Sequence, residues 1–146
     1  MSKKVVITGI GAITPIGNNC QQTWTNAIQG ISGIRKIEQP WTEGLAAKIA
    51  GLVNVDVETI LGKLQMRRMD RSSQLGVLAV KEAWTDSGIT EVDKKRLGVY
   101  FGTGIGGLST VLEQYDVLNN RGPERVNPLT VPMIMPNSAA AMVGLC

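Results

Sequence analysis

The sequence contains no histidine, and this absence restricts its chemistry more than any other feature of its composition. Histidine is the one side chain whose unperturbed pKa suits it to proton transfer near neutral pH. A mechanism that depends on histidine would therefore need side chains from outside these 146 residues.

Cysteine is almost as scarce. Cys20 and Cys146 are the only two, they lie far apart, and they form no CxxC or Cys/His spacing. Neither a disulfide framework nor a zinc site is indicated, and no metal or cofactor is expected. This cysteine usage is typical of a cytoplasmic protein.

Aromatic residues and long apolar runs are also missing. Only 4% of the residues are aromatic and the net charge is a modest +3, so nucleic-acid binding is not expected. The longest apolar run, residues 138–146, is far shorter than the ~20 residues that a membrane-spanning helix needs. With 43% hydrophobic and 18% charged residues, the chain has ordinary globular composition.

The apolar residues that are present alternate between strand-like and helix-like spacing, which predicts an α/β fold. Strands are predicted at 5–8, 46–53 and 97–101. The first helix is predicted to follow the candidate caps Asn18 and Asn19 and to run through Trp24 to Gln29, and further helices are predicted at 57–64, 71–87 and 138–145. The apolar repeat at 108–118 predicts a helix that closes near Gly122-Pro123. The helix at 71–87 is apolar almost all round and is expected to be buried, whereas the helix at 108–118 is amphipathic. Only irregular connection is expected between Gly30 and Gly44.

The last ten residues, 137–146, predict a helix of small residues that stays apolar to its final position without a polar cap. A buried helix end must satisfy its last carbonyl groups, and natural termini tend to be exposed and polar. We therefore expect the native chain to continue beyond Cys146.

The motif Gly102-x-Gly104-x-x-Gly107 has two interpretations. Between a strand and a helix it has the form of a dinucleotide-binding fingerprint, in which glycines let the backbone approach a pyrophosphate. No acidic residue ends a second strand about twenty positions later, as that fingerprint requires. A tight turn packed against neighbouring backbone is the favoured interpretation.

Lys63, Arg67 and Arg68 place three cations within six residues, and positions 63 and 67 share one face of a helix. Such a cluster is usually a solvated surface. The alternative is a docking site for an acidic partner.

The order of the motifs is more specific than any one of them. In sequence they are Val5-Val6-Ile7-Thr8-Gly9-Ile10-Gly11, Thr14-Pro15-Ile16-Gly17, Trp24, Gly30-x-Ser32-Gly33-Ile34, Arg67-Arg68-Met69-Asp70, Gly102-Thr103-Gly104-Ile105-Gly106-Gly107, Gly122-Pro123, Asn127-Pro128-Leu129 and Pro136-Asn137. Over essentially its whole length the chain resembles the elongating β-ketoacyl-acyl-carrier-protein synthases. Residues 133–137 look most like the members that extend already long acyl chains.

This resemblance implies a thiolase-like layered α/β fold, of which residues 1–146 would be the N-terminal portion, and a homodimer. It also implies a decarboxylative condensation of an acyl thioester with malonyl-carrier protein, in fatty acid biosynthesis. The family uses a cysteine in an Ala-Cys-Ser/Thr context and two histidines, and none of these is present here. No catalytic residue is assigned, Cys20 and Cys146 included, and the chain alone is expected to be inactive.

The resemblance further implies two functional surfaces. The acyl pocket would be lined by Gly104, Ile105, Thr130, Ile134, Met135 and Asn137. Many relatives carry an aromatic residue at the position of Thr130, so threonine would leave room for long acyl chains. Lys63, Arg67 and Arg68 would dock the acidic acyl carrier protein. Two other functions stay open: a non-catalytic subunit that sets chain length, and an independent nucleotide-binding module.

Overall fold

The computed structural model describes residues 4–145, which divide into two units. Within that range, unit 1 comprises residues 4–55 and 81–88, and unit 2 comprises residues 56–80 and 89–145. Helix α4 (Arg71–Ser87) contributes residues to both.

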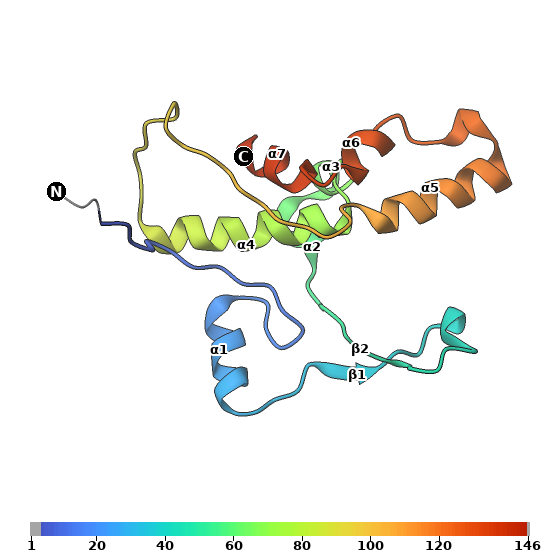
Figure 1. The fold of residues 1–146 in the computed structure, drawn as a ribbon, viewed down its shortest axis with the longest axis horizontal. Helices are drawn as coiled ribbons and strands as arrows, with labels where there is room; N and C mark the ends of the chain where they lie inside the picture. Colours follow the sequence, from blue (N-terminus) through green and yellow to red (C-terminus); the bar gives the residue numbers. More distant parts are fainter. Residues whose placement is uncertain (1–3, 146) are drawn as a thin grey trace. The chain divides into compact units, whose positions relative to one another are not determined.

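Unit 1 contains helix α1 (Cys20–Ile28) and a two-stranded sheet (Figure 1). The helix begins after Asn19, whose side chain accepts a hydrogen bond from the Gln22 N–H at 2.7 Å, as N-cap residues do. Strands β1 (Ile34–Lys36) and β2 (Ile49–Gly51) pair antiparallel, with Ile34 opposite Gly51. A short 3-10 helix, η1 (Pro40–Thr42), lies between them in sequence.

Two carboxylates of α4 fasten the amino-terminal loop of unit 1. Glu82 accepts hydrogen bonds from the backbone N–H groups of Ala12 at 2.9 Å and Cys20 at 2.7 Å, and Asp86 accepts one from Ile10 at 2.9 Å. Cys20 is the first residue of α1, so Glu82 also places a negative charge at the positive end of that helix.

Unit 2 is mainly helical. It holds α2 (Val57–Leu61), α3 (Lys63–Met66), the first part of α4, α5 (Leu108–Arg121), the 3-10 helix η2 (Pro123–Arg125), α6 (Thr130–Ile134) and α7 (Ser138–Gly144). Helix α5 packs against η2 and α6, drawn in orange and red in Figure 1. The buried apolar side chains of this unit are Val57, Leu61, Met69, Val77, Leu78, Met133 and Ala139.

The predicted helices are confirmed, except that the one predicted at 57–64 is divided at Gly62, whose φ is 77°, into α2 and α3. The predicted strands are mostly wrong. Residues 5–8 and 97–101 form no strand, and the strand predicted at 46–53 is confined to β2. Neither failed segment pairs with another strand among the described residues, and an extended segment without a partner has no ladder of hydrogen bonds. The region between Gly30 and Gly44 is not wholly irregular, because it contains β1 and η1.

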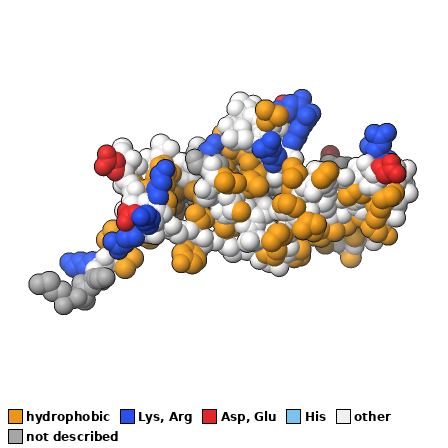
Figure 2. All heavy atoms as spheres, turned by 90° about the horizontal axis from the view of Figure 1, so that it is seen from above, with side chains coloured by type: hydrophobic (Ala, Val, Ile, Leu, Met, Phe, Trp, Pro, Cys, Tyr) orange, Lys and Arg blue, Asp and Glu red, His pale blue; other side chains and the backbone are white. Residues whose placement is uncertain are grey.

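Burial differs from the sequence expectation for both long helices. Helix α4 is buried at Ser73, Gln74, Gly76, Val77 and Leu78, but Trp84 near its end is exposed, so it is not buried all round. The apolar stripe of α5 is 41–62% exposed; it consists of Leu108, Val111, Leu112, Tyr115 and Leu118. Figure 2 shows hydrophobic side chains at many places on one face of the molecule.

No helix in the described part of the chain has both the length and the apolar content to cross a membrane.

Candidate functional site

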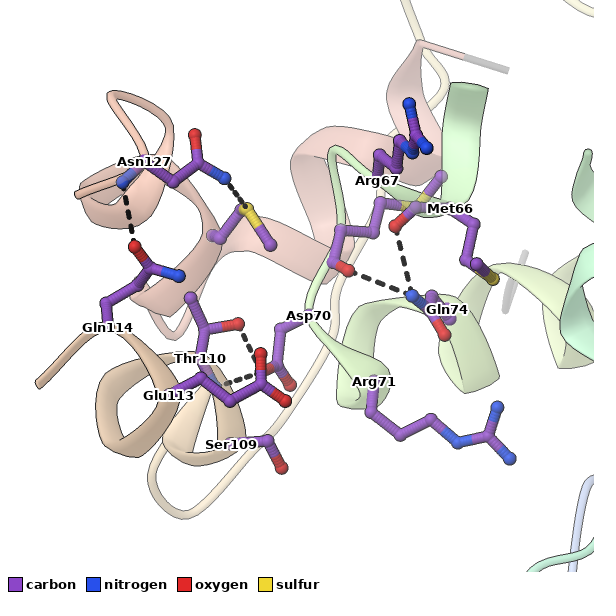
Figure 3. Close-up of a pocket in the computed structure, with 12 residues that line it drawn as sticks. Met66, Arg67, Asp70, Arg71, Gln74, Ser109, Thr110, Glu113, Gln114 and Asn127 are labelled. Atoms are coloured by element: carbon purple, nitrogen blue, oxygen red, sulfur yellow. Dashed lines mark hydrogen bonds between the residues drawn. The ribbon is translucent and has the colours of Figure 1, made fainter. Parts of the chain in front are cut away.

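Unit 2 contains an open cavity of about 410 Å³ (Figure 3). Its lining comes from three places: the junction of α3 and α4 between Met66 and Gln74, the first turns of α5, and Asn127 with Met133. Most of these side chains are polar, and three of them organise the surrounding backbone.

Asp70 joins the start of α4 to the start of α5. Its carboxylate is almost fully buried and accepts hydrogen bonds from the N–H and hydroxyl of Ser72, at 2.9 and 2.8 Å, and of Thr110, at 3.0 and 2.7 Å. Burial alone would raise the pKa of Asp70, but the hydrogen bonds from Ser72 and Thr110 outweigh it and hold that pKa below its ordinary value. The carboxylate therefore stays ionised near neutral pH.

Gln74 is buried one helical turn further along α4. Its amide nitrogen donates to the carbonyl oxygens of Met66 and Met69, both at 3.0 Å. Figure 3 shows both bonds, with the Arg67 side chain directed away from the amide. Gln74 thus ties the junction between α3 and α4 to the body of α4. A glutamine within a helix expected to be buried was the sequence signal for this role, since a buried amide needs partners.

Asn127 organises the entry to α6. Its N–H donates to Gln114 of α5 at 2.7 Å, and its side-chain oxygen accepts from the N–H of Leu129 at 2.9 Å. The Thr130 hydroxyl donates to the Asn127 carbonyl at 2.5 Å. The threonine that the resemblance assigns to the acyl pocket therefore also joins the first residue of α6 to the loop before it.

The favoured interpretation of the glycine motif is confirmed in part. Residues 104–107 form a bend, called here the glycine turn, and Gly106 and Gly107 pack against neighbouring backbone, whereas a Cβ on Gly102 or Gly104 would meet nothing within 4 Å. The Gly107 N–H donates to the Ile134 carbonyl at 3.2 Å. A Cβ placed on Gly106 would lie 2.5 Å from the Ile134 oxygen, and one on Gly107 would lie 2.5 Å from the Met133 oxygen. These glycines are thus required for close contact between two segments of the same unit, and residues 97–101 form no strand ahead of them.

The same contact brings together parts of the predicted acyl pocket. Gly104 and Ile105 lie on the glycine turn, which abuts the backbone of residues 133–136, where Ile134 and Met135 are found. Ile105 is 65% exposed, and Met135 and Asn137 are also exposed. None of the six residues predicted for the acyl pocket lines the 410 Å³ cavity.

The three predicted docking cations are exposed, and they lie on α3 and the junction that follows it. The Arg67 N–H donates to the Lys63 carbonyl at 3.2 Å, which places the two residues one helical turn apart as expected. Only Arg67 of the three also lines the cavity.

Cys20 is the one cysteine within the described residues 4–145. Cys20 opens α1 and is a free cysteine, whereas Cys146 lies outside the described residues. Over residues 4–145, no three histidine, cysteine, aspartate or glutamate side chains are grouped so that they could hold a metal ion.

Comparison with known proteins gives a consistent family. Residues 2–146 match the family described as "Beta-ketoacyl synthase, N-terminal domain". The chain is 42% identical over 147 residues to 3-oxoacyl-[acyl-carrier-protein] synthase 2 of Staphylococcus aureus strains COL and N315, which covers 99% of this chain and 36% of the relative. The chain thus spans about a third of the length of these curated relatives.

The structure also superposes on solved ketosynthases. One is a type II PKS acyl-carrier protein in complex with its ketosynthase bound to the hexaketide, with TM-score 0.80, 25% identity, and coverage of 99% of this chain and 40% of that one. A β-ketoacyl synthase from Burkholderia phymatum gives TM-score 0.81 at 24% identity over 99% of this chain and 36% of that one. The ishigamide ketosynthase/chain length factor gives a TM-score of 0.74 at 26% identity, and the match covers 96% of this chain and 36% of that one. These likenesses confirm the thiolase-like fold predicted from the sequence.

Proposed function

Because the chain belongs to the β-ketoacyl synthase family, we propose that it is the amino-terminal portion of a 3-oxoacyl-acyl-carrier-protein synthase of fatty acid biosynthesis. The observation that carries the proposal is the 42% identity to the staphylococcal synthases, which extends over 99% of this chain. We propose further that the complete enzyme is a cytoplasmic homodimer.

The proposed reaction is a decarboxylative condensation. An acyl group passes from its carrier to a cysteine thiol, and malonyl-carrier then loses CO2 to give an enolate. The enolate attacks the acyl thioester, which forms a carbon–carbon bond and releases the thiol with uptake of a proton. Because this chain has no histidine and no cysteine in the family's catalytic context, it supplies recognition surfaces and not the reacting groups.

The test is an assay of the complete enzyme with acyl-carrier and malonyl-carrier. The expected products are CO2 and a 3-oxoacyl-carrier two carbons longer than the primer, while the 146-residue chain alone should form neither. Absence of condensation by the complete enzyme would contradict the proposed reaction.

Lys63, Arg67 and Arg68 form the proposed carrier-docking site. Three exposed cations on one short segment suit an acidic carrier protein, and a related ketosynthase has been solved with its own carrier protein. Carrier affinity should fall as salt is raised and should fall further with Arg68→Glu. Binding that ignores both changes would reduce this cluster to solvated surface.

Gly104, Ile105, Thr130, Ile134, Met135 and Asn137 form the proposed wall of the acyl pocket. The packing of the glycine turn against residues 133–136 supports the grouping of Ile105 with Ile134 and Met135. We expect Ile105→Phe to shift the products of the complete enzyme to shorter chains, because the larger ring would narrow the pocket. Unchanged product lengths would remove Ile105 from the pocket.

A non-catalytic subunit that sets chain length is the second candidate, and the likeness to the ishigamide ketosynthase/chain length factor favours it. A chain-length subunit would form 3-oxoacyl products only together with a catalytic partner. The condensation assay on the purified complete protein, with and without such a partner, separates the two candidates.

A further inference from the structure

Gln74 holds the backbone on both sides of two of the proposed docking cations. Its single amide nitrogen donates to the carbonyls of Met66 and Met69, and the residues between them are Arg67 and Arg68. An amide carries two N–H donors, so both bonds can form at once. Gln74 is only 9% exposed, so water cannot readily replace either bond.

The segment from Met66 to Met69, between the two carbonyls that Gln74 binds, has little regular structure of its own. Helix α3 has only four residues, far fewer than an isolated helix needs in water. The turn that follows contains two backbone hydrogen bonds, from the Arg68 N–H to the Gln65 carbonyl at 3.1 Å and from the Met69 N–H to the Met66 carbonyl at 3.2 Å. Without an outside anchor this turn would fray.

A second anchor follows directly. Asp70, the next residue after Met69, is fixed by its bonds to Ser72 and Thr110, so the segment from Met66 to Asp70 is held at both ends. The hydrogen bonds of Gln74 and Asp70 described here are all to backbone groups or to neutral side chains. The two guanidinium groups are left exposed to solvent.

We propose that Gln74 is a positioning residue for carrier docking, which fixes the backbone of Arg67 and Arg68 so that both cations are presented together. The inference rests on the proposed docking site. Its physical basis is preorganisation: cations that are already ordered lose less conformational freedom when the acidic partner binds.

The substitution that isolates this role is Gln74→Met, which keeps the length of the side chain and removes both donors. The matched control is Val77→Ala, a change at a fully buried position of the same helix and the same unit. It costs packing energy but leaves both Gln74 bonds in place.

Carrier binding by the complete enzyme is measured as a Kd for the two variants, alone and in an Arg67→Ala/Arg68→Ala background. Gln74→Met should weaken binding about threefold to tenfold, the effect of releasing one or two ordered side chains. It should have no further effect once both arginines are gone, because residues that act through one another are non-additive. Val77→Ala should bind the carrier like the wild type in both backgrounds.

The outcomes separate the inference from the docking site on which it rests. If wild-type binding ignores salt and Arg68→Glu, the docking site itself fails. If docking holds but Gln74→Met weakens binding no more than Val77→Ala does, or weakens it equally without the arginines, then Gln74 is only a structural residue and the inference is overturned. Should Gln74→Met fail to fold, Gln74→Asn replaces it, since the shorter amide cannot reach both carbonyls; wild-type affinity and an unchanged salt dependence would then overturn the inference.

Discussion

The interactions that stabilise unit 1 differ from those that stabilise unit 2. In unit 1, within the described residues, only Thr42 and Val55 bury their side chains, and the amino-terminal loop is fastened by carboxylates of α4 that bind backbone N–H groups. In unit 2, seven apolar side chains form a core, and the polar groups beside it are buried as well. The stability of unit 1 should therefore depend on charged hydrogen bonds near the surface, and that of unit 2 on burial.

The strongest test of this difference is Asp70→Ala in unit 2. The change leaves the donors of Ser72 and Thr110 without their acceptor, and the Thr110 donors are buried. We expect a loss of about 3 kcal/mol in the free energy of unfolding of unit 2, since buried donors without partners are costly. Amide hydrogen exchange should rise in α5 and at the start of α4 and stay unchanged in α1. Equal loss of protection in α1 would show that the two units unfold together.

Acid should weaken unit 2 by a smaller amount. Because the folded pKa of Asp70 lies below the ordinary carboxyl value of 3.8, the stability contributed by the ionised group is complete above that value. It is lost as the pH falls through the lower, folded pKa. Hydrogen bonds from Thr59 lower the pKa of Asp56 in the same unit, so acid unfolding is compared with that of Asp70→Asn. The substituted chain should show a shallower loss of stability below about pH 4; parallel curves would contradict the role of Asp70.

Glu82→Gln should affect unit 1 alone. The amide keeps one oxygen, so one of the two bonds from Ala12 and Cys20 is lost. Since Glu82 is only partly buried, we expect a loss of about 1 kcal/mol, measured by hydrogen exchange at those two amides. Glu43→Gln, at an exposed position of the same unit, is the matched control and should change nothing. A similar loss of protection at Thr110 would break the distinction between the units.

Leu112→Gln should have the smallest effect, although it replaces a residue of the apolar stripe of α5. Leu112 is 58% exposed, so the free energy of unfolding should change by no more than about 0.5 kcal/mol. Leu78→Gln, at a buried position of the same unit, should lower it by about 3 kcal/mol. A large effect at Leu112 would mean that the stripe of α5 is covered by another surface under the conditions of the measurement.

The helices could be predicted because their signals are local. Asn19 caps α1, and Gly122, with φ of 87°, ends α5 where the Gly-Pro signal predicts. The family could be predicted as well, because it depends on the order of short motifs. Strands depend on distant partners, so Val5–Thr8 and Leu97–Phe101 gave a correct local pattern and a wrong element.

The candidate site was only partly predictable for the same reason. Arg67 could be found from charge alone, but the bonds of Asp70 to Thr110 join residues forty positions apart. No local sequence pattern predicts such a pair. The exposure of Leu112 (58%) and Tyr115 (62%) could not be predicted either. An amphipathic pattern identifies an apolar face of a helix, but it does not show whether another part of the protein covers that face.

The packing of the glycine turn on residues 133–136 has a consequence for how the protein can change over generations. The two segments meet through main-chain atoms: the Gly107 N–H, the carbonyls of Met133 and Ile134, and the bare α-carbons of two glycines. Contact of this kind places no demand on which side chains stand at Ile105, Ile134 and Met135. Those three positions belong to the proposed acyl pocket, and they can be exchanged while the backbone that carries them is inherited intact. If the proposal holds, the selectivity of the enzyme can evolve without loss of the fold.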